Sequence, residues 1–188
     1  MRDTKEKLSM TSVALHWVIG LSILTLMTVG VYMTDYEVYA LYPLHKSIGS
    51  LIFLVILFRV IWRMINGWPE STANYKKWEM NLARFVQWIL ITATVLIPIS
   101  GLLMSSMGGY GLQIFGAELL AANPSPDDPY KMIPLNGPIA GFAHEAHGLL
   151  GKVIFVAIVL HITGALKHHF ADKSDFTLRR MLGLKKKS

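Results

Sequence analysis

Cysteine is absent from the sequence of 188 residues. Without thiols the chain cannot form disulfides, hold an iron–sulfur cluster through thiolates or attach a c-type haem through a C-x-x-C-H motif. The chain also has no glycine-rich phosphate loop, no HExxH motif and no paired-carboxylate motif, so no local pattern supports nucleotide hydrolysis or zinc proteolysis. Histidine, present seven times, is the side chain that remains for binding a metal.

Charged residues are also scarce, at 16% of the chain, whereas hydrophobic residues make up 53%. This composition fits an integral membrane protein better than a typical soluble domain. The apolar residues gather in four blocks, at about 10–32, 44–65, 85–105 and 142–170, each long enough to cross a hydrocarbon core of about 30 Å. We therefore predict an all-α fold, with residues 1–188 forming a single membrane domain built as a bundle of four transmembrane helices.

The first apolar block follows a charged leader, as the apolar part of a secretory signal peptide does. Its apolar part is too long for a signal peptide, and no small-x-small cleavage site follows it. We expect this block to stay in the mature protein as the first transmembrane helix.

Basic residues are distributed unevenly between the two ends of such a bundle. Four spans would place both termini and the 66–84 connection on one side, and all of the eighteen lysines and arginines lie on that side except Lys46, Lys131 and Lys152. By the positive-inside rule both termini are expected in the cytoplasm, and the long connection at 106–140 in the periplasm. Because this topology explains the net charge of +6, no nucleic acid is expected as a partner.

The last apolar block contains His147 and His161, which are separated by thirteen residues with only one charge, Lys152. At about 100° and 1.5 Å per residue, the two rings share a helix face to within about 40° and stand about 21 Å apart. Imidazoles at lipid depth are costly and commonly mark an ion path, a relay or a metal site. The spacing indicates two stacked metal centres.

Two more histidines lie at matching depths in earlier blocks. His16 lies in the inner half of its block, as does His161, whereas His45 and His147 lie in the outer part of theirs. Glycine follows three of these histidines at i+4, which leaves room beside the ring for a flat macrocycle. We therefore predict two b-type haems with bis-histidine iron, one bound by His16 and His161 and the other by His45 and His147.

Arg59 and Lys152 are further candidates for cofactor binding. Arg59 follows His45 by fourteen residues, so it falls on nearly the same face at the level of the inner centre, where a haem propionate would be its acid partner. Snorkelling towards the helix end is the alternative for Arg59. Lys152 lies about one and a half turns below His147. At this depth its amine needs a carboxylate or water as a partner, and a haem propionate or a bound quinone would be such a partner.

The remaining histidines are expected to have simpler roles. We expect His144 to be solvated at the outer mouth of the last helix, and therefore not to be a ligand. His168 and His169 are expected to pack at the inner interface, with protonation of a quinone as the alternative. Within the 106–140 connection, apolar residues over 112–120 fall at helical spacing and predict a short surface helix that roofs the outer centre.

Several short motifs extend along almost the whole chain. They are HW at 16–17, LHKSIG at 44–49, FRVIWR at 58–63, ISG at 99–101, the histidine interval 147–161, and ALKHHFADKSDFTLRRMLG at 165–183. Taken together, this set resembles the bacterial cytochrome b561 family of di-haem membrane cytochromes. The resemblance implies that the four matching histidines are axial ligands, paired first helix with fourth and second helix with fourth.

The resemblance also implies a function in a bacterial inner membrane, surrounded by membrane lipid. The expected function is transmembrane electron transfer through two haems, linked to the ubiquinone pool of the respiratory chain, with a periplasmic electron donor or acceptor such as superoxide or a protein. Two alternatives stay within redox chemistry: a superoxide oxidase that reduces ubiquinone, and a membrane anchor subunit of a dehydrogenase or hydrogenase. A histidine-lined transporter is the alternative outside that class, and it predicts helices broken near the midplane.

Overall fold

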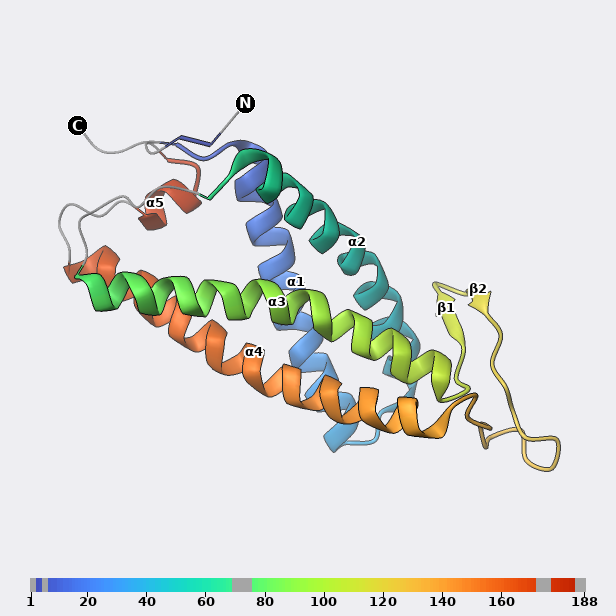
Figure 1. Ribbon diagram of the computed structural model, residues 1–188. Helices are drawn as coiled ribbons and strands as arrows, with labels where there is room; N and C mark the ends of the chain where they lie inside the picture. Colours follow the sequence, from blue (N-terminus) through green and yellow to red (C-terminus); the bar gives the residue numbers. More distant parts are fainter. Residues whose placement is uncertain (1–2, 5–6, 69–75, 172–176, 185–188) are drawn as a thin grey trace.

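The computed structural model describes residues 3–4, 7–68, 76–171 and 177–184, and it is mostly helical (Figure 1). Its four long helices are α1 (Met10–Asp35), α2 (Tyr42–Asn66), α3 (Lys77–Met107) and α4 (Gly137–Ala171). Each is long and apolar enough to cross a membrane. The prediction of four helices of membrane-spanning length is therefore confirmed, which is consistent with a multi-pass membrane protein.

All four helices extend beyond the apolar blocks that predicted them. α3 begins at Lys77 because residues 77–84 contain mostly good helix formers, although they are not apolar. α4 begins at Gly137, where the side chain of Asn136 accepts a hydrogen bond from the Ile139 N–H at 3.1 Å. Such a cap satisfies one of the free donors of the first turn. Hydropathy thus located the lipid-depth part of each helix but not its ends.

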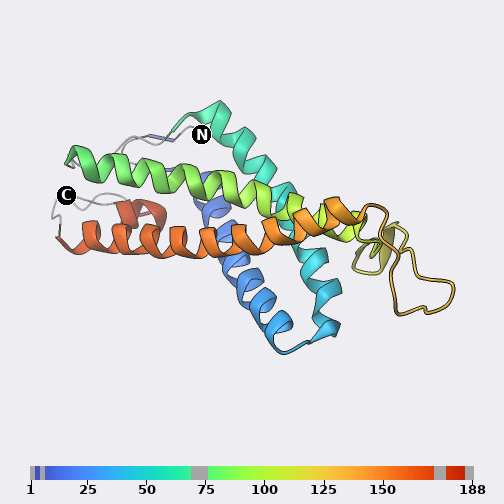
Figure 2. The same ribbon diagram turned by 60° about the horizontal axis from the view of Figure 1, so that its bottom comes forward.

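The helices pack as two neighbouring pairs. α3 runs along α4 and α1 packs against α2, while α2 also contacts α3 (Figures 1 and 2). The short helix α5 (Thr177–Met181) lies near the start of α1, where the Trp17 indole N–H donates to the Met181 carbonyl oxygen at 2.8 Å. We call this end of the bundle the terminal end. The opposite end, where α3 finishes and α4 begins, is called the hairpin end.

A hydrophobic core fills the middle of the bundle. It is formed by Ile19, Ile23 and Leu26 of α1, Ile52 and Ile56 of α2, Ala93 of α3 and Ile154 of α4. Ile154 is completely buried and lies midway between His147 and His161, seven residues from each. Since seven residues are about two helical turns, the same face of α4 presents a histidine, the core isoleucine and the second histidine.

The long connection between α3 and α4 contains a β-hairpin, so the prediction of a short helix over residues 112–120 is wrong. Strands β1 (Leu112–Ile114) and β2 (Ala117–Leu120) pair antiparallel. Phe115 and Gly116 between them have φ angles of 48° and 88°, the left-handed conformation of a two-residue hairpin turn, which glycine favours. The positive φ at this turn is incompatible with a continuous helix.

Hydrogen bonds attach the hairpin to the ends of two helices. The Ser47 hydroxyl of α2 accepts from the Phe115 N–H at 3.0 Å, and the Ser105 hydroxyl of α3 donates to the Gly111 carbonyl oxygen at 2.6 Å. Both serines are buried. The hairpin is therefore held over the start of α2 and the end of α3. Its anchor on α2, Ser47, lies two residues after His45.

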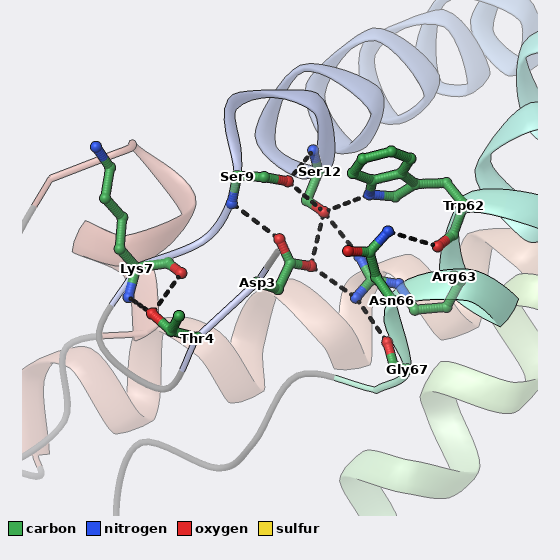
Figure 3. Close-up of polar contacts among 9 residues, drawn as sticks. All are labelled: Asp3, Thr4, Lys7, Ser9, Ser12, Trp62, Arg63, Asn66 and Gly67. Atoms are coloured by element: carbon green, nitrogen blue, oxygen red, sulfur yellow. Dashed lines mark hydrogen bonds and ion pairs between the residues drawn. The ribbon is translucent and has the colours of Figure 1, made fainter. Parts of the chain in front are cut away.

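At the terminal end, a polar cluster joins the N-terminal segment to α1 and α2 (Figure 3). The Asp3 carboxylate accepts from the Ser9 N–H at 2.8 Å, from the Ser12 hydroxyl at 2.7 Å and from the Arg63 guanidinium at 3.0 Å. The Trp62 indole N–H donates to the Ser12 hydroxyl oxygen at 2.9 Å. Because the Asp3 side chain is only 3% exposed, these bonds replace water and fix the start of α1 against the end of α2.

The charge state of Asp3 follows from this cluster. Partial burial raises the pKa of the Asp3 carboxyl, but the hydrogen bonds from Ser9 and Ser12 and the charge of Arg63 outweigh that effect. The pKa therefore lies below its ordinary value of 3.8.

Replacing Asp3 with Asn should lower the stability at neutral pH by about 1–3 kcal/mol, because Arg63 and Ser12 lose a charged acceptor. Since the folded pKa lies below 3.8, the stabilisation is present above that value and is lost as the pH falls through the folded pKa. Thermal unfolding in detergent should therefore show a smaller loss of melting temperature on acidification for Asp3→Asn than for the parent. Asp127→Asn, at an exposed loop carboxylate, is the matched control, and equal behaviour of the two variants would contradict this role.

Candidate metal centres

Two pairs of histidine rings lie inside the bundle, one towards each end. At the hairpin end, the ring centroids of His45 on α2 and His147 on α4 are 6.4 Å apart, with the ring planes inclined at 75°. At the terminal end, the centroids of His16 on α1 and His161 on α4 are 6.1 Å apart, with the planes inclined at 55°. The structure thus brings the four histidines together in the two pairs that their depths predicted.

Both separations suit a metal ion bound by two imidazole nitrogens. A metal–nitrogen distance of about 2 Å, with each ring centroid about 1 Å behind its nitrogen, places the two centroids about 6 Å apart. All four rings are half-buried, and His45 Nδ1 is a buried nitrogen without a hydrogen-bond partner among the described residues. Two imidazoles supply two axial ligands, which fits a metal whose other ligands come from a macrocycle.

α3 contains no histidine, yet it orients one of the four rings. Nδ1 of His147 lies 2.9 Å from the Ile97 carbonyl oxygen and 3.1 Å from the Ser100 hydroxyl oxygen. The Ser100 hydroxyl donates to the same carbonyl at 2.8 Å, so its oxygen is free to accept. Nδ1 of His147 therefore carries the proton, and Nε2 keeps its lone pair for a metal.

Two glycines face the rings of the hairpin-end pair from neighbouring helices. A Cβ added at Gly101 of α3 would lie 3.1 Å from Cε1 of His147, and one at Gly30 of α1 would lie 3.4 Å from Cε1 of His45. Any side chain larger than hydrogen at Gly101 would press on the ring. The pair therefore has close backbone neighbours on both α1 and α3.

Neither facing glycine was predicted from the sequence. The glycines one turn after a histidine on the same helix are Gly20, Gly49 and Gly151, and a Cβ at any of them would meet no heavy atom within 4 Å. That open space agrees with room for a macrocycle beside the rings. Spacing along one helix does not reveal which residue of another helix lies opposite, so no signal in the sequence identified Gly30 or Gly101.

Comparison with known proteins agrees with this geometry. A profile of the prokaryotic cytochrome b561 family matches residues 8–184. The chain belongs to this family. Cytochrome b561 homolog 2 of Escherichia coli (strain K12) is 33% identical over 186 residues, which cover 96% of this chain and 94% of that protein.

Two further relatives are more distant. Cytochrome b561 homolog 1 of Escherichia coli (strain K12) is 22% identical over 187 residues, covering 94% of this chain and 97% of that protein. The probable superoxide oxidase CybB of Yersinia pestis is 23% identical over 180 residues, covering 94% of this chain and 96% of that protein. Cytochrome b561 proteins transfer electrons in membranes, and the family name implies a b-type haem, whose iron suits paired imidazoles.

Arg59 lies at the terminal-end pair, as its spacing from His45 predicted. It is half-buried, and its positive charge acts on both His16 and His161. No carboxylate of the described residues forms an ion pair with it. The contact of Arg59 with a haem propionate stays a prediction.

Lys152 is not brought to either pair. Its side chain is exposed and lines an open groove on α4 with His144 and Glu145. It lies five positions after His147, which is about 140° around the helix, so the lysine lies on a face of α4 turned away from the His147 ring. The structure gives no contact that would support the expected cofactor-binding role of Lys152.

The other histidines lie outside both pairs. His144 is exposed, and its Nδ1 lies 3.2 Å from the Met104 sulfur of α3. His168 and His169 are half-buried near the terminal end of α4. Beside them, Lys167 forms an ion pair with Glu79 of α3, which joins α3 to α4 at that end.

Replacing Gly101 with Ala should disturb the hairpin-end pair selectively. The new methyl would lie 3.1 Å from the His147 ring, and such overpacking typically costs about 1–3 kcal/mol. We expect a lower haem content or an altered absorption band for one centre, measured on purified protein. Gly148→Ala, where a Cβ would meet nothing within 4 Å, is the matched control on α4. Identical spectra for Gly101→Ala and the parent would argue against the close approach of Gly101 to the ring.

Proposed function

We propose that the chain carries electrons across the membrane through two b-type haems. His45 and His147 are the axial ligands of the haem at the hairpin end, and His16 and His161 are those of the haem at the terminal end. The observation that carries this proposal is the presence of two imidazole pairs, with centroids 6.4 and 6.1 Å apart, on either side of one apolar core. Bound haem supplies reversible one-electron chemistry of iron.

The side chains around the two histidine pairs determine whether the haems transfer electrons or bind a ligand. His45 and His147, and likewise His16 and His161, would supply two imidazoles to each haem, and a haem held in this way would be suited to electron transfer and not to binding a small ligand. The isoleucine-rich core keeps water away from the space between the pairs, and His147 and His161 are separated by about 21 Å along α4. The hydrogen bonds from His147 to Ile97 and Ser100 make that imidazole a stronger ligand.

The orientation follows from the positive-inside rule. Because lysine and arginine concentrate at the terminal end, that end faces the cytoplasm of a bacterial inner membrane. The pair His45–His147 then lies near the periplasmic surface, and His16–His161 near the cytoplasmic surface. Ubiquinone or ubiquinol is the membrane-soluble redox partner, and superoxide or a protein is the periplasmic partner.

Superoxide oxidase activity with ubiquinone as the acceptor is the second candidate function. It is supported by the similarity to the probable superoxide oxidase of Yersinia pestis over 94% of this chain. A histidine-lined transporter is disfavoured, because that class uses helices interrupted near the midplane and α1, α2, α3 and α4 are each continuous. The anchor-subunit alternative shares the haem assignment and differs only in the partner.

The purified protein should contain two non-covalent, low-spin b-type haems per chain, which acidified acetone should extract. His45→Ala and His147→Ala should each remove the same haem, and His16→Ala and His161→Ala should each remove the other, because each haem loses one of its two ligands. Haem content by pyridine haemochrome assay and the low-spin signals by electron paramagnetic resonance would test this. A high-spin remnant at the altered centre is compatible with one surviving ligand.

His144→Ala is the matched control for these variants, since this exposed histidine lies three residues from His147 and should leave both haems in place. Full retention of both low-spin centres after His161→Ala would overturn the ligand assignment. A covalent haem, or one haem per chain in the parent, would overturn the proposal of two b-type centres.

The electron donor can be identified by stopped-flow reduction with superoxide or ubiquinol, followed by oxidation with a ubiquinone analogue. If superoxide donates at the periplasmic end, removing the hairpin-end haem by His45→Ala should abolish its reduction of the remaining haem. Rising ionic strength should also slow the parent, because exposed cations such as Lys131 attract the anion. An unchanged rate in His45→Ala, with no salt dependence, would exclude entry at that haem and favour a quinol donor from the lipid.

A further inference from the structure

One cation at the hairpin end, Lys46, is half-buried and has no role in the proposed function. Lys46 follows His45 directly in α2, and its Nζ donates a hydrogen bond to the Ser105 hydroxyl of α3 at 3.1 Å. Ser105 is buried, and its own hydroxyl is committed to the Gly111 carbonyl. The lysine side chain is therefore held between α2 and α3, beneath the start of the hairpin, and does not extend freely into solvent.

The position of the ammonium relative to the histidine pair follows from α3. Gly101 faces the His147 ring, and Ser105 lies four residues later on the same face of α3, about 6 Å further towards the hairpin end. The Lys46 side chain also leans back towards the start of α2, as side chains on helices do. Its ammonium thus lies about one helical turn beyond the His45–His147 pair, on the side of the nearer membrane surface.

Lys46 has no acid partner among the described residues, where the ion pairs are Arg63–Asp3 and Lys167–Glu79. A half-buried ammonium with one neutral hydrogen-bond partner is costly unless an anion completes its surroundings. The terminal-end pair shows the same arrangement, since Arg59 of α2 lies near His16 and His161 and forms no ion pair with a carboxylate in the described part of the chain. α2 thus supplies one unpaired cation to each histidine pair.

We infer that Lys46 is the charge partner of a propionate carboxylate of the haem bound by His45 and His147. This inference rests on the proposed function, because the carboxylate belongs to the haem. It reassigns the role that the sequence suggested for Lys152, whose side chain is exposed and turned away from the His147 ring. It also makes Lys46 a fixed charge that stabilises reduced haem, because a nearby cation opposes the extra positive charge of the oxidised iron.

The test compares Lys46→Met, Lys46→Arg and Lys152→Met by redox titration and haem quantification. Methionine keeps much of the apolar stem but removes the charge, so Lys46→Met should shift the reduction equilibrium of one haem about tenfold towards the oxidised form. The affected titration wave should be the one that His45→Ala removes. Lys46→Arg should restore the parental titration, and Lys152→Met should leave both waves unchanged.

Haem content separates the possible causes. If Lys46→Met loses the hairpin-end haem altogether, recovery of that haem in Lys46→Arg still supports a charge contact. The inference is overturned if arginine and methionine behave alike, if Lys152→Met gives the same shift, or if Lys46→Met keeps both waves at their parental positions. In the last case the two unchanged titration waves would contradict the lysine contact but remain compatible with the proposed function. A parent with fewer than two haems would instead contradict the proposed function itself.

Discussion

Imidazole nitrogens at lipid depth have no water to satisfy them, and much of the bundle is arranged around that constraint. The four deep histidines form two pairs, and α4 supplies one ring to each pair. His147 of α4 also donates to the Ile97 carbonyl of α3. Between the pairs the buried core is apolar, and Ile154 at its centre is completely buried. Polar chemistry is thereby confined to two levels of the membrane, each close to one surface.

The sequence predicted the elements that depend on position along a single helix. Long apolar runs located the four spans, and the interval from His147 to His161 placed two rings on one face at two depths. The hairpin was not predicted, because the apolar residues over 112–120 also fit a helical spacing, whereas the positive φ angles of Phe115 and Gly116 turn the chain back between two strands. The exposed direction of Lys152 was derivable from the same helical geometry that paired the histidines, since it lies about 140° from His147.

Apart from the two histidine pairs, the contacts between helices could not be predicted from the sequence. Gly30 and Gly101 face histidine rings, and Lys46 reaches Ser105 on α3, but these facts depend on the rotation and register of one helix against another. The role of α3 illustrates the difference. It contains no histidine, yet Ser100 and Ile97 orient a ring on α4, and Ser105 anchors both a lysine and the hairpin.

α4 contributes a ring to both pairs, whereas α1 and α2 contribute one ring each. α4 also packs along α3 and is tied to it by Lys167 and Glu79 near the terminal end. A rotation of α4 about its axis would turn both of its rings away from their partners together, and a slide would displace both in the same direction. The two levels are therefore mechanically coupled through α4. Substitutions that adjust one level without moving the other belong on α1, α2 or α3.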